Sequence, residues 1–287
     1  MRIFKFVAGV GVLFSLCGCT MSWQPQVDGF QQSKPNDQSI EMLESADNCF
    51  GNAGDLQKLT VCEDLYLAVL KENPGDYNAL TQLSTINILL GTAYTNTGYG
   101  KSEHFLQAMR YAEQAMYSNT EFRTKIEQGE TLWGAIDSLS EREAEAMFFW
   151  VTALQYEFKE SMSLPEKVFN IKWLQRALLV IEQVEKGAPE FGGGGVEFAK
   201  AICYYALPGR YGGSEELGDE AMQAAIEHND NWLLPRWARA KYYYVITGQT
   251  EKSQSELKWI AGQNPEQFRD PYPWRIHFIE NSAALLD

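Results

Sequence analysis

Few residues in this chain have the types and spacing that catalysis requires. The histidines, His104, His228 and His277, are scattered, and none has a second metal ligand four residues away. No serine or cysteine has an identifiable base beside it. Gly192 to Gly195 could present free amides to an anion, but no strand is predicted before them and no P-loop lysine follows, which favours a flexible turn. We therefore expect no catalytic residue, no metal site, no cofactor and no enzymatic activity.

Consecutive aromatic residues are the most conspicuous candidates for binding. Three such runs fall in predicted helices: Phe148-Phe149-Trp150, Tyr204-Tyr205 and Tyr242-Tyr243-Tyr244. Adjacent helical positions point about 100° apart, so one buried stripe cannot take every member of a run. The aromatic rings could complete the core, or they could line an apolar cavity in which tyrosine hydroxyls also bind. We take Trp150, Tyr204, Tyr205 and Tyr243 as candidate ligand- or partner-binding residues.

Helical periodicity covers most of the chain, and strand signals are nearly absent. One apolar stripe joins Val196, Ala199, Cys203 and Ala206 at helical spacing. The helices are expected in pairs, followed by a last helix: 40–49 with 56–72, 77–94 with 102–117, 140–161 with 165–186, 196–207 with 214–228, 232–247 with 250–263, and then 274–286.

The last of these pairs carries a repeat signature. Small residues at Ala238 and Ala240 allow close packing, Gly248 turns the chain, and Asn264-Pro265 ends the second helix. This spacing suits a tetratricopeptide-type unit of about 34 residues. Asn73-Pro74 ends an earlier predicted helix in the same way. The helix pairs between these two sites match the repeat pattern only weakly. The sequence therefore predicts an all-α fold, an α-solenoid of degenerate tetratricopeptide-type helix pairs.

The N-terminus predicts an export signal. Arg2 and Lys5 precede an apolar run, Phe6 to Leu16, that is too short to span a bilayer. Leu16-Cys17-Gly18-Cys19 then resembles a bacterial lipobox, in which Cys19 becomes the lipidated first residue of the mature protein. An ordinary secretory signal containing two cysteines is the alternative. We expect a lipoprotein signal peptide over 1–18, a flexible polar tether over 19–38 and a helical domain over 39–287.

The charge balance excludes several kinds of partner. Loss of the signal would remove two basic residues and change the net charge from −14 to −16. Phosphate backbones and anionic lipid headgroups repel a surface with this much negative charge. We therefore expect no nucleic-acid binding. No later run is long enough for a transmembrane helix, and membrane attachment is expected through the acyl chains of a lipid anchor.

Cysteines outside the signal indicate one disulfide. Cys49 and Cys62 flank a Gly-rich turn between two predicted helices and could meet across that hairpin. An oxidising compartment favours closure of such a pair, which would stabilise the fold by about 3 kcal/mol. Cys203 lies on the apolar stripe of a predicted helix and is expected to be a buried thiol.

A family resemblance rests on residues 204–213, Tyr-Tyr-Ala-Leu-Pro-Gly-Arg-Tyr-Gly-Gly. This segment resembles the T component of some tripartite ATP-independent periplasmic (TRAP) transporters, the TatT-like family. The family pattern is a helix ending in Tyr-Ala-x-Pro, a short link to Gly-Gly, and a new helix, here from Ser214. Further matches are 62–74, 146–150 and the final unit ending at Asn264-Pro265. The likeness covers nearly all of the mature chain, although only the Pro-to-Gly-Gly segment is distinctive.

The resemblance implies a periplasmic, lipidated protein that cooperates with the solute-binding subunit of a TRAP transporter. It also implies a channel or groove for a small hydrophobic ligand, and some members form oligomers, so a homo-oligomer is left open. Thr20 after Cys19 favours the outer membrane over the inner membrane. Two alternatives remain: a tetratricopeptide scaffold lipoprotein in envelope assembly or secretion that binds no ligand, and a degenerate periplasmic hydrolase.

The distinctive segment is also expected to be a structural turn. Pro208 should end one helix, and Gly212 and Gly213 should allow a tight turn, with Gly213 at positive φ. Arg210 and Tyr211 lie on the exposed link between the helices and are further candidate binding residues.

Overall fold

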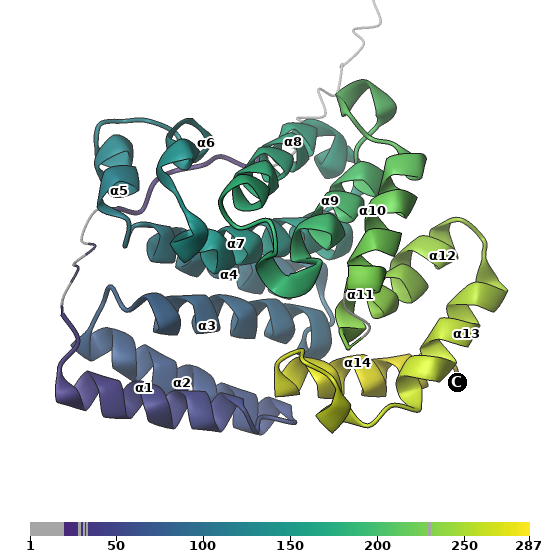
Figure 1. The fold of residues 1–287 in the computed structure, drawn as a ribbon, viewed down its shortest axis with the longest axis horizontal. Coiled ribbons are helices and arrows are strands. Elements are labelled where there is room, and N and C mark those ends of the chain that lie inside the picture. The colour runs from purple at the N-terminus through teal and green to yellow at the C-terminus, as the bar shows by residue number, and fades with distance from the viewer. Residues whose placement is uncertain (1–19, 28–29, 31, 33, 229–230) are drawn as a thin grey trace, which may run out of the picture.

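The computed structural model describes residues 20–27, 30, 32, 34–228 and 231–287, and every regular element among them is helical (Figure 1). The predicted all-α solenoid is therefore the observed fold. Its main helices are α1 Asp37–Phe50, α2 Leu56–Glu72, α3 Tyr77–Leu89, α4 Gly98–Met116, α7 Ala144–Tyr156, α8 Leu164–Gly187, α9 Gly195–Ala206, α10 Glu215–His228, α11 Leu233–Ala238, α12 Tyr244–Ile246, α13 Thr250–Ala261 and α14 Tyr272–Ala284.

Three of the predicted helices contain a π-helical turn. Leu90–Tyr94 extends α3, Glu157–Ser161 extends α7, and Arg239–Tyr243 joins α11 to α12. Such a turn adds a residue to the helical register and changes which side chains face a neighbour. The turns in α7 and between α11 and α12 carry Glu160 and Tyr242, which lie close together in the fold.

Two short helices were not expected from the sequence. These are α5 Thr120–Glu127 and α6 Leu132–Ala135, between the second and third predicted pairs. Side chains cap both: the Asn119 side chain accepts from Phe122 N, and that of Thr131 accepts from Gly134 N. Each of these helices buries only two apolar residues, Phe122 and Ile126 in α5 and Leu132 and Ala135 in α6.

The core is built around α3 and α7, whose side chains are buried on nearly every face. The C-terminal helix α14 returns to this core, where Trp274 Nε1 donates to Thr85 Oγ1 of α3 over 2.9 Å. Figure 1 shows α14 beside the end of the first helix layer, so the superhelix brings its two ends together. Residues 189 positions apart in the chain are thus in direct contact.

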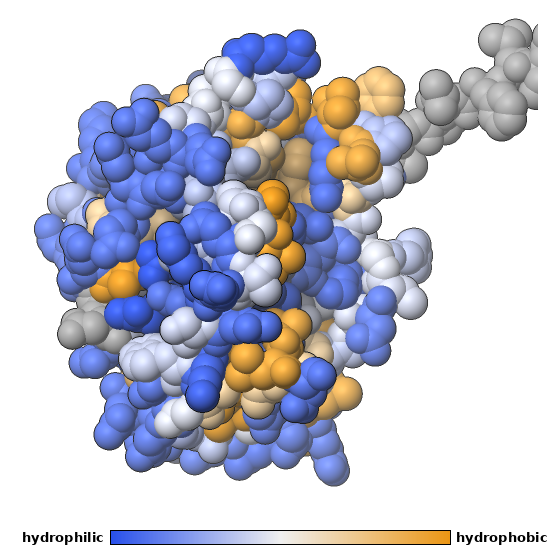
Figure 2. Space-filling model, turned by 90° about the vertical axis from the view of Figure 1, so that its right-hand side faces the viewer, coloured by the Kyte–Doolittle hydropathy of each residue, from blue (hydrophilic) through white to orange (hydrophobic). Residues whose placement is uncertain are grey.

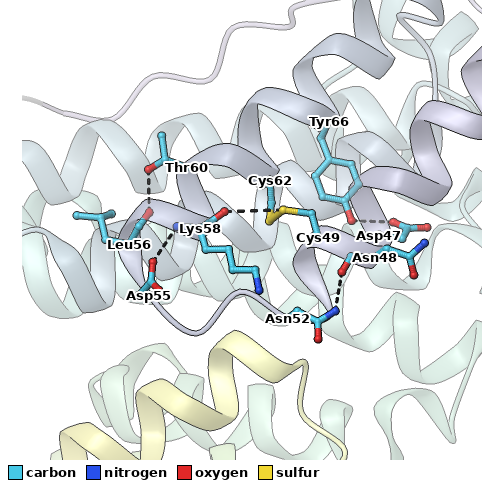
Figure 3. The surroundings of a disulfide bond; sticks show 10 residues. All are labelled: Asp47, Asn48, Cys49, Asn52, Asp55, Leu56, Lys58, Thr60, Cys62 and Tyr66. Atoms are coloured by element: carbon cyan, nitrogen blue, oxygen red, sulfur yellow. Dashed lines mark hydrogen bonds between the residues drawn. A yellow bond between two sulfur atoms is a disulfide. The ribbon is translucent and has the colours of Figure 1, made fainter.

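A disulfide ties α1 to α2, as the sequence predicted (Figure 3). The Cα atoms of Cys49 and Cys62 are 5.5 Å apart, and the Tyr66 hydroxyl donates to Asp47 Oδ1 on the same hairpin over 2.7 Å. Asp55 caps α2 by accepting from Lys58 N. This end of the solenoid is therefore closed by both a covalent and a polar link.

The described residues between 20 and 36, here called the N-terminal strap, lie on the body. Met21 N donates to Asn170 Oδ1 on α8 over 2.6 Å, and Trp173 Nε1 donates back to Met21 O. Trp23 Nε1 donates to Glu113 Oε2 on α4, and Phe30 packs edge-on to Tyr117. Part of the segment that composition predicts as a flexible tether is thus bound to the helices, because its few large apolar residues find partners there.

A buried ionic cluster holds α4 against the two π-helical turns. The Glu160 carboxylate accepts from Lys101 Nζ and from the Tyr242 hydroxyl, and Lys241 Nζ lies 3.6 Å away. Burial alone would raise the pKa of Glu160, but Lys241 and the hydrogen bonds from Lys101 and Tyr242 together lower it. We define the Glu160 cluster as these four residues.

Candidate functional site

The leading candidate site is an apolar cavity of about 520 Å³, partly open to solvent, in the C-terminal half of the solenoid. It lies between α7, α8, α9, α10 and the α11–α12 segment, and carbon-rich side chains form most of its wall. Its apolar lining includes Ile171, Leu174, Phe198, Ile202, Met222 and Ile246. Figure 2 views this side of the molecule and shows apolar side chains grouped among hydrophilic ones.

Tyr205 and Tyr243 form one wall of the cavity as a stacked pair. Their ring centroids are 4.1 Å apart with planes 19° from parallel. The Tyr205 hydroxyl donates to Asp219 over 2.7 Å, and the Tyr243 hydroxyl donates to Glu215 over 3.1 Å. Burial, and then these carboxylates, raise the pKa of both phenols. Both therefore stay neutral and have fixed orientations.

The structure separates the other predicted binding residues. Tyr204 lines the cavity with Tyr205 and Tyr243. Trp150 is fully buried and instead borders a second, more polar cavity of about 700 Å³ beside the N-terminal strap. Arg210 and Tyr211 are not among the residues that line either cavity; the Arg210 guanidinium lies 4.8 Å from the Tyr211 ring centroid on the exposed link.

The link from Pro208 to Ser214 is a tight turn, as expected, but its glycines act differently from the prediction. Gly212 has φ +95°, whereas Gly213 lies outside the left-handed region. A Cβ on Gly213 would come within 1.6 Å of Leu207 O, so this glycine permits close backbone approach. Ser214 N donates to Tyr204 O over 3.1 Å, which holds the turn against the last turn of α9. The turn thereby positions Tyr204 and Tyr205 in the cavity wall.

Sequence reasoning did not find the polar groups of the cavity. Lys159, in the π-helical turn after α7, and Lys167 of α8 line it. Burial, and then the charge of Lys167, lowers the pKa of Lys159. Gln155 Nε2 donates to Ala199 O over 2.9 Å and to Cys203 Sγ over 3.3 Å. These side chains come from helices whose mutual placement no local pattern specifies.

The arrangement can hold an apolar molecule but offers no obvious reaction chemistry. Burial raises the pKa of the Cys203 thiol to about 12, and its neighbour is the Gln155 amide rather than a base. No group of three or more His, Cys, Asp or Glu in the described part of the chain is arranged to hold a metal ion. Two lysines beside an apolar wall instead suit a ligand with an apolar body and an acidic group.

Several expectations concern residues that the structure does not describe or that it leaves open. The signal peptide over 1–18 and the lipidated Cys19 lie outside the described residues. No described helix combines the length and hydrophobicity that crossing a bilayer requires. Comparisons with family models and with curated proteins find no match for this chain.

Proposed function

We propose that the chain is a lipid-anchored periplasmic accessory protein of a TRAP-type transport system. In this proposal it binds the solute-binding subunit and holds a small hydrophobic ligand in the apolar cavity. The observation that carries the ligand part is the cavity itself, with Tyr204, Tyr205 and Tyr243 in its wall. The partner, the compartment and the lipid anchor rest on the resemblance at residues 204–213 and on the N-terminal signal.

The dimensions of the cavity support a small ligand. A volume of about 520 Å³ lies within the range that small-molecule sites occupy. The Tyr205 and Tyr243 hydroxyls are already bound to carboxylates, so their rings supply apolar contact area. Lys159 and Lys167 would pair with an acidic group, so we favour an apolar carboxylic acid.

The ligand part is tested by filling the cavity. Ile202 lines it from α9, so Ile202→Trp should abolish binding of a fluorescent long-chain carboxylic acid. Ile40→Trp, at an exposed position on α1, is the matched control and should bind like the parent. Thermal melting of each variant shows whether it is folded. If the folded parent does not bind the probe, or if Ile202→Trp binds it equally well, the cavity is not the site and the scaffold alternative gains support.

The partner part needs a separate experiment. The tagged mature chain is crosslinked in native periplasm, and the captured proteins are identified by mass spectrometry. Enrichment of a periplasmic solute-binding protein is the expected result. Enrichment of envelope-assembly or secretion components would contradict the transport role and leave a scaffold on the same fold.

A further inference from the structure

The N-terminal strap brings the site of the proposed lipid anchor close to one helix. Met21 is bound through both its N–H and its carbonyl, to Asn170 and Trp173 of α8. Cys19 is two residues before Met21, and two residues span at most about 7 Å. Acyl chains on Cys19 would therefore enter the bilayer near α8. This step rests on the lipidation included in the proposed function.

The solvent-exposed side of α8 is unusually apolar for a surface helix. Leu164, Val168 and Phe169 are 78%, 66% and 55% exposed, and Leu179 further along the helix is 49% exposed. At 100° per residue these positions fall within about 140° of the helix circumference. Asn170, Trp173 and Leu174 are buried on the opposite side. We call the four exposed residues the outer face of α8.

The polar residues around the outer face suit a membrane surface. Exposed Lys172 lies within the same arc of the helix. Long lysine side chains can keep their charge in the headgroup region while their stems lie along apolar surface. Of the carboxylates on α8, Glu166 accepts from Ser163 in the capping box at the helix start, and Glu182 and Glu185 lie beyond Leu179 toward the other end of the helix. The half of the outer face that carries Leu164, Val168 and Phe169 therefore has no exposed carboxylate among its own helix positions.

We propose that the outer face of α8 rests in the interface of the bilayer that holds the anchor. An amphipathic helix in this position buries its apolar side chains about 5–10 Å into the boundary of headgroups and acyl chains. The bilayer is the occupant we infer, because Met21 is bound to α8 and the proposed anchor residue, Cys19, precedes it by two residues. The body then lies on the membrane with α8 parallel to it.

The experiment measures contact between α8 and lipid directly. The lipidated chain, with Val168→Cys carrying a fluorophore, is reconstituted in vesicles of zwitterionic lipid that contain nitroxide-labelled acyl chains. Ile40→Cys on α1 is the matched control, because α1 lies on the opposite side of the molecule from α8 (Figure 1). Cys203 does not compete for label, since it is buried and Cys49 and Cys62 are joined in the disulfide.

We expect strong quenching of the label at position 168 and none at position 40. Adding Leu164→Glu and Phe169→Glu should remove the quenching at 168 while the protein stays bound to vesicles through its anchor. Lack of quenching at 168 in vesicle-bound parent protein would overturn the inference. Oxidative crosslinking of Val168→Cys to itself without quenching would also overturn it, because a second copy would then cover the face.

Failure of the anchor itself gives a different result. If mass spectrometry finds Cys19 unmodified and the chain does not float with vesicles, both the lipidation and this inference fall. The cavity test with Ile202→Trp is independent of that outcome.

Discussion

Neighbouring glycines in the turn after α9 are required for different physical reasons. Gly212 has a positive φ, which other residues rarely adopt, whereas a Cβ added at this position would meet nothing within 4 Å. Gly213 has an ordinary φ but no room for a Cβ beside Leu207 O. Sequence reasoning predicted that both would be structural and assigned the positive φ to Gly213, because a Gly-Gly pair does not reveal which member turns the chain.

The two glycines can be compared by alanine substitution. Gly212→Ala should lower the free energy of unfolding by about 1 kcal/mol, the cost of a left-handed conformation. Gly213→Ala should cost about 2–3 kcal/mol, because the backbone of the turn must move. Urea unfolding of both variants measures the difference. A larger loss at Gly212 than at Gly213 would contradict this account.

Glu113 is a buried carboxyl that meets the N-terminal strap. Burial raises its pKa to about 7, although hydrogen bonds from Tyr117 and Trp23 partly oppose this. Its folded-state pKa is therefore above its unfolded value, and the parent should lose stability as the pH rises from about 4.5 to 7.

Glu113→Gln removes that pH dependence. Like the protonated acid, the amide has one accepting and one donating group for Trp23 and Tyr117. At pH 8 the variant should be more stable than the parent by about 3 kcal/mol, and at pH 4.5 nearly equal to it. Other titrating groups cancel in this difference. Denaturant unfolding at both pH values checks it, and a gain of the same size at both would show that ionisation is not the cause.

At the scale of the elements, the Glu160 cluster joins α4 to the two π-helical turns. Glu160→Gln would leave Lys101 and Lys241 without their shared carboxylate in a poorly solvated place. We expect a loss of about 3 kcal/mol in the free energy of unfolding. Glu121→Gln, which breaks the exposed pair with Lys125, is the control and should cost less than about 0.5 kcal/mol. Urea unfolding of both variants measures these losses. Similar losses in Glu160→Gln and Glu121→Gln would show that the Glu160 cluster does not stabilise the packing of these elements.

Local pattern was sufficient for most of the helices. The stripe through Val196, Ala199 and Cys203 predicts α9 because its period matches the buried face of that helix. In contrast, α5 and α6 are short, and tertiary contacts of Phe122 and Leu132 stabilise them rather than an extended stripe. The binding of the strap to the body was not predicted for a related reason. Its composition is mostly polar, and the partners of Met21 and Trp23 lie far along the chain.

At the scale of the whole molecule, the candidate site depends on how distant helix pairs are placed. Tyr205 and Tyr243 could be recognised as candidates because their runs exceed what one stripe can bury. Their stacking across 38 positions, and the approach of Lys159 to the same cavity, follow from the superhelix. Trp150 satisfied the same sequence criterion but faces the strap instead, because the π-helical turns and the closure by α14 are not visible in local periodicity.

The bound strap also sets how far a lipidated form could reach. If residues 19–38 formed a free coil, the folded body would lie at an average distance of roughly 25 Å from its anchor. Because Met21 is bound to α8, the chain between the anchor and the body spans at most about 7 Å. Search for a partner then becomes two-dimensional diffusion within a thin layer at the membrane. A soluble partner of such a lipidated form would have to approach that layer, and the fixed orientation of the body would present the same face of the solenoid to it each time.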